Sequence, residues 1–227
     1  MKIKRILLSV SCLMGLALVQ AQAQIIPLVN GDFQANTAKT FIFNSDGTPS
    51  GLIPGWVPSG PGVSPNYDNG GSGNEGVEAT GNYGGSMHLF LNNLDPSVYQ
   101  TSAYSIMDGD AFALTLNVGG EWADNGLHNE LLSIYYVNGA SRVSFASTVI
   151  SAPQDWAYHS YTLNGVAPVA ADGKLVGVEF QEVSSTSAGT SVSWTAFDNV
   201  VLGVPEPASI ALFGIGGLAL LAFRRRA

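Results

Sequence analysis

Acidic residues are the most numerous titratable groups in the chain, seventeen in all. Two carboxyl groups about 5 to 10 Å apart can hydrolyse a glycosidic bond, one as acid and the other as nucleophile or base. The pairs Glu75/Glu78 and Glu121/Asp124 are close enough in sequence to be considered. With so many acids such pairs arise by chance, so they do not indicate a glycosidase.

The histidines form no catalytic or metal-binding pattern. His88, His128 and His159 are scattered, without a His-x-x-x-His or His-Glu spacing of the kind that binds zinc. A Gly-x-Ser-x-Gly nucleophile motif is absent, and the glycine cluster at 69–76 precedes no helical pattern that could bind phosphate. The sequence therefore predicts that the protein is not an enzyme.

Aromatic side chains could instead bind a sugar, because a pyranose ring has an apolar face that packs on a large, rigid aromatic ring. The candidates are Tyr67, Tyr83 and Trp122, all in polar, Gly-rich or Asn-rich surroundings. Buried packing is the competing role for each of them. We assign the other tryptophans to the core or its rim: Trp56, Trp156 and Trp194.

The elements that must position these residues follow a strand pattern. Short segments rich in Val, Ile, Tyr, Phe and Thr recur, and Phe112, Leu114, Leu116 and Val118 alternate as one buried face of a strand would. No segment between the chain ends shows a long amphipathic helical pattern, so we predict an all-β, two-sheet β-sandwich. The predicted strands are 86–91, 98–106, 111–118, 131–137, 142–150, 157–163, 175–183 and 191–202.

Turn residues separate the strands. Four dipeptides supply the positive φ that tight turns need: Asp108-Gly109, Asn138-Gly139, Asn164-Gly165 and Asp172-Gly173. The segment 44–85 is loaded with Gly, Pro, Ser and Asn, and we predict mostly long loops there. Apolar residues should anchor these loops to the sandwich: Ile53, Trp56, Val57, Tyr67, Val77 and Tyr83.

The N-terminal residues 1–23 predict a signal peptide. Three basic residues precede an apolar run from Ile6 to Val19, and Ala21-Gln22-Ala23 provides small residues for cleavage. The only cysteine, Cys12, lies inside this segment. The exported chain therefore has no thiol for a disulfide, a zinc site or catalysis.

The C-terminal residues 204–227 predict a membrane anchor in three parts. Pro205-Glu206-Pro207 keeps the chain extended. The next sixteen residues, Ala208 to Phe223, are apolar, which is short for a transmembrane helix that usually needs about 20 residues. Arg224, Arg225 and Arg226 follow and favour a cytoplasmic C-terminus by the positive-inside rule.

Without these two ends, the remaining domain is strongly acidic. Only Lys39, Arg142 and Lys174 are left against sixteen acids, a net charge of −13. Nucleic-acid binding depends on Lys and Arg that neutralise phosphates, so this function is excluded. The charge fits calcium-rich or matrix surroundings, and it equally fits simple solubility outside the cell.

The tail from Val204 to Arg226 resembles the PEP-CTERM sorting domain of Gram-negative and related bacteria, in its Pro-Glu-Pro motif, short apolar helix and basic end. The resemblance implies export, recognition by a membrane-embedded exosortase, and cleavage near Pro-Glu-Pro. It also implies release to the cell surface or an exopolysaccharide matrix. An ordinary membrane anchor is the alternative.

A second resemblance covers most of residues 28–202. The segments 30–33 (Asn-Gly-Asp-Phe), 53–56 (Ile-Pro-Gly-Trp) and 197–202 (Phe-Asp-Asn-Val-Val-Leu) are similar to those of the galactose-binding-like jelly rolls found in bacterial carbohydrate-binding modules. The resemblance implies that the first and last strands are neighbours and that Phe33 and Trp56 pack in the core. It also implies a structural calcium ion held by acidic or amide groups near these strands.

Asp32 and Asp198 are the candidate calcium ligands, because calcium takes six to eight oxygen ligands from carboxylates, amides and backbone carbonyls. Hydrogen bonds of these carboxylates to nearby backbone, as in Asx turns, are the alternative. Asp108 and Asp110 have a calcium-like spacing but lack the rest of an EF-hand loop. A hairpin turn explains them better.

These features predict an exported β-sandwich protein (residues 24–203) that is processed by signal peptidase and an exosortase. It is anchored transiently in the inner membrane and then located at the cell surface or in the extracellular matrix. Two functions remain open: a carbohydrate-binding or adhesive module that acts on extracellular polysaccharide, or a ligand-free structural component of the matrix.

Overall fold

The computed structural model describes residues 24–41, 52–59, 76–79, 83–92, 97–121, 128–153, 155–185 and 194–205. Residues 25–203 form one compact unit, and of the second unit (residues 1–24 and 204–227) only Gln24, Val204 and Pro205 are described. The predicted signal peptide and the apolar tail lie outside the described residues. Within the described ranges, no helix is long and apolar enough to cross a membrane.

Strands dominate the described chain, and the eight predicted strands are present with shifted ends. They are β5 (Met87–Asn92), β6 (Ser97–Ser105), β7 (Ala111–Glu121), β8 (His128–Asn138), β9 (Ser141–Ala152), β10 (His159–Val166), β11 (Leu175–Ser185) and β12 (Trp194–Val204). Four short strands were not predicted: β1 (Gln24–Ile26), β2 (Thr40–Phe41), β3 (Val57–Ser59) and β4 (Gly76–Ala79). One short 3-10 helix, η2 (Val169–Ala171), lies between β10 and β11.

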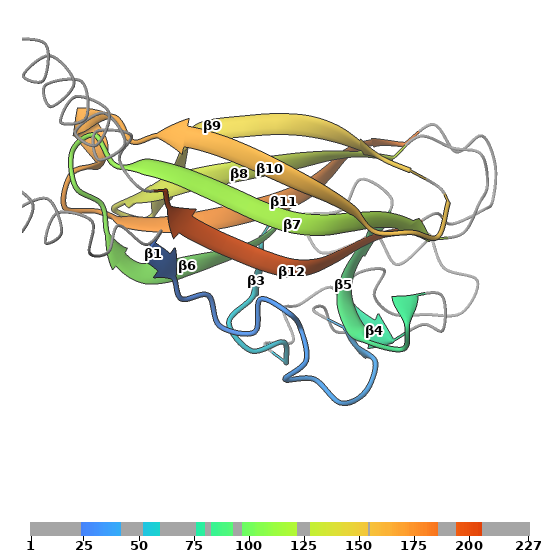
Figure 1. Cartoon of the computed structure of the whole chain (residues 1–227). Helices are drawn as coiled ribbons and strands as arrows, with labels where there is room; N and C mark the ends of the chain where they lie inside the picture. The colour runs from blue at the N-terminus through green and yellow to red at the C-terminus, as the bar shows by residue number, and fades with distance from the viewer. Residues whose placement is uncertain are drawn as a thin grey trace, which may run out of the picture. The chain divides into compact units, whose positions relative to one another are not determined.

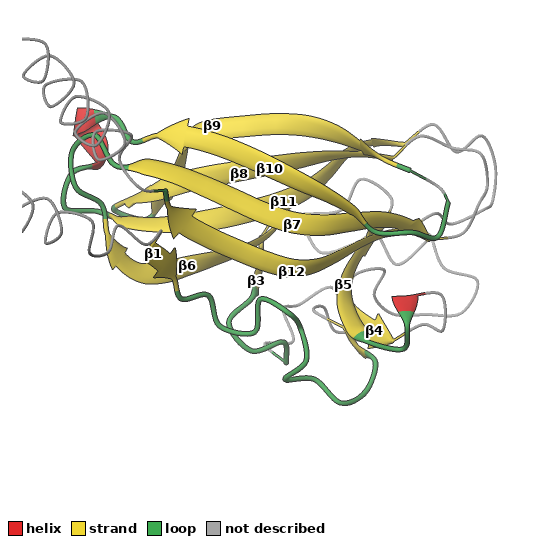
Figure 2. Ribbon diagram, in the orientation of Figure 1, coloured by secondary structure: helices red, strands yellow, loops and turns green. Residues whose placement is uncertain are grey.

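The strands form two sheets that face each other, which confirms the predicted sandwich (Figure 1 and Figure 2). The seven-stranded sheet has the order β10-β7-β12-β5-β4-β2, and β1 also pairs with β12. The five-stranded sheet has the order β3-β6-β11-β8-β9. The first and last strands are therefore neighbours, as the jelly-roll resemblance implied.

The core lies between the two sheets. The alternating residues of β7 are each at most 2% exposed, as their period of two predicted: Phe112, Leu114, Leu116 and Val118. Phe180 of β11 stacks on Phe197 of β12, with ring centroids 5.2 Å apart, and so links the two sheets. Trp56 packs on both Phe33 and Phe180 at centroid distances of 5.2 and 5.5 Å, which confirms that the Phe–Trp pair belongs to the core.

Three of the four predicted turn dipeptides carry a glycine with positive φ: Gly109, Gly139 and Gly173. The fourth prediction was wrong, because Asn164 and Gly165 lie inside β10, opposite Ala113 and Phe112. A Cβ on Gly165 would lie 2.5 Å from the Cβ of Ala146 in β9. This glycine lets β10 approach β9 closely. In the sequence, a glycine needed for such an approach cannot be distinguished from one needed for a turn.

The described parts of the 44–85 segment hold it to the sandwich through β3, β4 and a few buried side chains. Ile53, Trp56, Val77 and Tyr83 are at most 7% exposed and act as the predicted anchors. Val57 is 43% exposed, so its prediction as an anchor was wrong. Tyr67 lies outside the described residues.

Candidate ligand-binding and metal-binding sites

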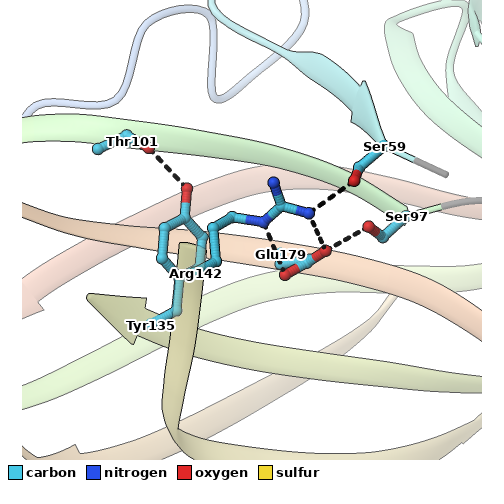
Figure 3. Close-up of polar contacts among 6 residues, drawn as sticks. All are labelled: Ser59, Ser97, Thr101, Tyr135, Arg142 and Glu179. Atoms are coloured by element: carbon cyan, nitrogen blue, oxygen red, sulfur yellow. Dashed lines mark hydrogen bonds and ion pairs between the residues drawn. The ribbon is translucent and has the colours of Figure 1, made fainter. Parts of the chain in front are cut away.

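One cluster of charged and aromatic side chains lies on the outer face of the five-stranded sheet. Tyr99 of β6 pairs with Glu179 of β11, and Tyr135 of β8 pairs with Gly177 of β11. Side chains alternate along a strand, so these residues share the face opposite to the buried Val178 and Phe180. Arg142, at the start of β9, reaches over this face (Figure 3).

Arg142 is the centre of the cluster. Its Nε donates to Oε2 of Glu179 at 3.2 Å and its Nη2 donates to Oε1 at 3.0 Å, a two-point ion pair. Nη2 also donates to the hydroxyl of Ser59 at 2.7 Å, and the Ser97 hydroxyl donates to Glu179. The guanidinium carbon lies 3.7 Å from the centre of the Tyr99 ring, a cation–π contact. Burial lowers the pKa of Arg142, but the hydrogen bonds and charge of Glu179 outweigh it and raise that pKa overall.

Tyr135 forms the rigid base of this cluster. It is fully buried, shares a 2.7 Å hydroxyl hydrogen bond with Thr101, and burial raises its pKa to about 12, so it stays neutral. Its ring crosses Gly177 so closely that a Cβ there would lie 2.3 Å from the ring atom Cζ. Only glycine leaves room for the ring, which fixes the surface under Arg142.

The cluster retains groups that can bind a polar ligand. The Arg142 and Glu179 side chains are 24% and 22% exposed. Figure 3 shows the third guanidinium nitrogen, Nη1, directed away from Glu179, and it has no hydrogen-bond partner among the described residues. The site can therefore offer a cationic donor that lies over an aromatic ring and has several hydroxyl groups around it.

The sequence did not predict this cluster. Its members come from five strands, and Ser59 is 83 residues from Arg142 in the chain. One signal was present: Arg142 is one of only three basic residues in the exported part, so an arginine inside a predicted strand needed an explanation. No periodicity could identify Glu179 as its partner.

The two predicted calcium ligands are brought to the same part of the fold. Asp198 of β12 is 5% exposed and lies at a bulge where Asn199 has a φ of 52°. The backbone N–H of Val200 donates to the carbonyl of Gly31 at 2.9 Å, so the loop with Asp32 lies against this bulge. A Cβ on Gly31 would lie 2.5 Å from the Val200 carbonyl oxygen, so only glycine permits the contact.

The electrostatics of Asp198 reflect these neighbours. Burial raises its pKa to about 6, the nearby charge of Asp32 adds to the increase, and the Asn199 N–H and His88 oppose it. Asp32 itself is exposed and accepts a hydrogen bond from the Gln34 N–H at 3.3 Å, which is the Asx-type contact of the alternative reading. Among the described residues, no group of three or more His, Cys, Asp or Glu side chains is placed to hold a metal ion.

The three predicted sugar-binding aromatics do not form a platform in the described structure. Tyr83 is 7% exposed, donates to the Gly120 carbonyl at 2.9 Å and stacks on Tyr158 at 4.3 Å. Although its sequence neighbours are polar, Tyr83 packs in the interior, so the prediction that it forms an exposed platform was wrong. Tyr67 and Trp122 lie outside the described residues.

The other acids flagged in the sequence have structural contacts. Asp110 accepts hydrogen bonds from the Tyr104 hydroxyl and the Met107 N–H, both at 2.9 Å, as expected of a turn. Glu78 pairs with Lys39 at 2.6 Å. Glu75, Glu121 and Asp124 have no described side chain.

The sandwich also contains a buried pair of acids that the sequence did not predict. Glu130 of β8 and Glu182 of β11 are cross-strand partners, 0% and 1% exposed. Burial first, and the charge of Glu182 second, raise the pKa of Glu130 well above its ordinary value. Thr195 lies beside Glu130 and opposes that shift. This pair belongs to the interior and offers no surface to a ligand.

Solved structures support the fold. A cyclase from Fischerella sp. TAU superposes with a TM-score of 0.60 and 15% identity, over 82% of this chain and 98% of that chain. A putative sugar binding protein from Bacteroides thetaiotaomicron VPI-5482 superposes with a TM-score of 0.51 and 12% identity, over 81% of this chain and all of that chain. Such low identities show a shared fold alone.

Carbohydrate-binding modules also occur among the similar structures. One, solved with β-1,4-galactotriose, covers 78% of this chain at 12% identity with a TM-score of 0.46, and this likeness is too low to support an argument. No curated protein was found to match the chain.

The C-terminal segment matches a family model. Residues 203–226 match the PEP-CTERM protein-sorting motif, which confirms the resemblance inferred from the tail. The motif implies processing by an exosortase, export, and a membrane-anchored sorting signal. Its Pro205 directly follows β12, while Glu206, Pro207 and the three arginines 224–226 lie outside the described residues. The chain thus carries a PEP-CTERM sorting motif behind a two-sheet, jelly-roll-like β-sandwich.

Proposed function

We propose that the protein is an exported, non-enzymatic carbohydrate-binding or adhesive module, and that its sugar site is the Arg142 cluster. The observation that carries the proposal is the partly exposed Arg142–Glu179 ion pair beside Tyr99. Fixed donors and acceptors suit a sugar because they bind its hydroxyl groups, and the Tyr99 ring under the guanidinium holds these groups in place.

The ligand class follows from charge. The exported part carries three basic residues against sixteen acids, so it repels polysaccharides rich in uronic acid or sulfate. Within the described cluster, one arginine is already neutralised by Glu179. We therefore propose neutral extracellular polysaccharide as the ligand, in the exopolysaccharide matrix or at the cell surface after signal peptidase and exosortase have acted.

Binding to neutral polysaccharides tests this proposal. We expect Tyr99→Ala and Arg142→Ala each to weaken binding of a neutral polysaccharide at least tenfold, because Arg142→Ala removes the donor and Tyr99→Ala removes the ring that holds the guanidinium in place. Affinity electrophoresis and calorimetry against a panel of neutral glycans provide the measurement. Tyr161→Ala is the matched control, since Tyr161 lies on β10 in the other sheet and bonds only to the Ser151 carbonyl.

The competing function is a ligand-free structural component of the matrix. The observation that favours it is the extensive pairing of the cluster within the protein, where Glu179 accepts from both Arg142 and Ser97. Under this alternative, no glycan binds and Arg142→Ala lowers only stability. If a glycan binds the wild type and both cluster variants equally well, the Arg142 cluster is not the sugar site.

We further propose that Asp198 and Asp32 bind a calcium ion. Two observations support this: their segments are in contact, and, besides burial, the charge of Asp32 contributes to the raised pKa of Asp198. In the apo protein the pKa of Asp198 rises from 3.8 to about 6 on folding. Its contribution to stability is therefore complete below about pH 4 and is lost as the pH rises through about 6. Calcium requires the ionised carboxylate, so it should stabilise most above pH 6.

Thermal unfolding with calcium or chelator checks this prediction. A ligand at one hundred times its Kd stabilises by about 2.7 kcal/mol, which raises the melting temperature visibly at pH 7.5. Asp198→Asn should abolish that increment and flatten the pH dependence between 4 and 6, and Asp32→Ala should also abolish the increment. Asp108→Asn, in the exposed turn, should leave it intact. Melting of the metal-free wild type that ignores both calcium and chelator would reject the site.

A further inference from the structure

Four exposed apolar side chains gather at one end of the sandwich, and we call this group the apolar tip. Its members are Met107, Val166, Val169 and Leu175, which are 62%, 64%, 75% and 41% exposed. They come from the turn between β6 and β7 and from the connection between β10 and β11. Side chains this apolar are expected in the interior or against a partner.

Backbone hydrogen bonds hold the apolar tip together. The Ile106 N–H donates to the Lys174 carbonyl at 2.8 Å, and the Gly173 N–H donates to the Ile106 carbonyl at 2.9 Å. The Ala167 N–H donates to the Asp110 carbonyl at 2.8 Å. The two connections therefore form one fixed surface rather than separate loops.

The apolar tip lies at the end of the sandwich where β12 finishes. Gly203 of β12 is opposite Ala113 of β7, and Val166 of the tip is opposite Ala111 of the same strand. Two residues of a strand span about 7 Å. Figure 1 shows the end of β12 and the connection after β10 at the same end of the sheets.

A short tether joins this end to the membrane. Pro205 follows β12, and the apolar stretch of the PEP-CTERM motif begins at Ala208. The four residue steps from Val204, the end of β12, to Ala208 reach at most about 14 Å. Once the sorting signal is anchored, the end of β12 must stay within about that distance of the membrane.

We propose that the apolar tip contacts the surface of the lipid bilayer while the protein is anchored by its sorting signal. The inference rests on the anchoring that the PEP-CTERM motif implies, and it is independent of sugar binding on the sheet face. The neighbouring carboxylates of Asp108 and Asp172 are exposed and repel anionic headgroups. The contact is therefore apolar and insensitive to salt.

Fluorescence quenching in vesicles tests the contact. The full chain with Cys12→Ser is reconstituted in phosphatidylcholine vesicles with brominated acyl chains, and a fluorophore is attached at Met107→Cys. Val149→Cys is the control, because Val149 is comparably accessible (56% exposed) but lies away from the apolar tip. Its partner on β8 is Leu131, whereas Val176, next to Leu175 of the tip, pairs with Tyr136, five residues further along β8. We expect quenching at position 107 to exceed that at 149 severalfold and to persist in 1 M salt.

A second variant distinguishes a contact between the apolar tip and the bilayer from simple proximity caused by the tether. Val166→Ser combined with Val169→Ser removes apolar surface at exposed positions and leaves the tether unchanged. We expect it to reduce quenching at position 107 at least twofold. Equal quenching at positions 107 and 149, loss of quenching in high salt, or no effect of the double substitution would each overturn the proposal.

Discussion

Replacing Pro205, Glu206 and Pro207 with alanine is expected to stop release of the protein and leave the full-length chain in the membrane. The sequence predicts that the two prolines keep this segment extended, as a protease requires, and alanine would permit a helix where proline does not. Immunoblots of membrane and medium fractions measure the effect, which should approach complete loss of the released form.

The control is a variant that changes three residues of the tail but keeps their positive charge. Arg224, Arg225 and Arg226 replaced together by lysine preserve the positive charge that orients the helix, so membrane insertion should stay normal. Release that continues unchanged in the alanine variant would show that the Pro-Glu-Pro segment is not the recognition element, and the sorting assignment would fail.

Replacing Trp56 with alanine is expected to have the largest effect on stability. The side chain is 2% exposed, packs between Phe33 and Phe180, and donates its Nε1–H to the Asn30 carbonyl at 3.1 Å. A Trp→Ala change in a core costs about 3–5 kcal/mol. A domain is stable by only about 5–15 kcal/mol, so much of the folding free energy would be lost.

Urea denaturation of the wild type and the variants measures this loss. Trp56→Phe keeps an aromatic ring between its two neighbours and removes the hydrogen bond, so it should cost clearly less than the alanine variant. If both substitutions cost under 1 kcal/mol, Trp56 does not hold the segment around Asn30 and Phe33 to the core in the way that these contacts indicate.

Much of the fold was predictable because it depends on local pattern. The alternation from Phe112 to Val118 expresses the two-residue period of a strand with one buried face, whatever its neighbours are. Asp108-Gly109 and Asn138-Gly139 are turns because glycine alone adopts positive φ without strain. The same reasoning failed at Asn164-Gly165, where glycine serves the approach of β9, a neighbour that local pattern does not identify.

The candidate sites were less predictable. Asp32 and Asp198 were chosen as candidates because short motifs at both ends of the domain resembled a known fold; the structure places their segments together, and their role as calcium ligands stays a prediction. Tyr83 was misjudged because its polar neighbours in sequence are not its neighbours in space, where it stacks on Tyr158. The Arg142 cluster had no local signal apart from an uncommon arginine.

The sorting motif and the all-β class could be predicted without a structure, since the first depends on contiguous residues and the second on strictly periodic ones. The pairing of side chains depends on the tertiary structure, as for Arg142 with Glu179 and Glu130 with Glu182. Strand order and register set these encounters, and they depend on pairings between segments tens of residues apart. A linear pattern states that a residue faces inward or outward, but the sheet topology alone determines what it faces.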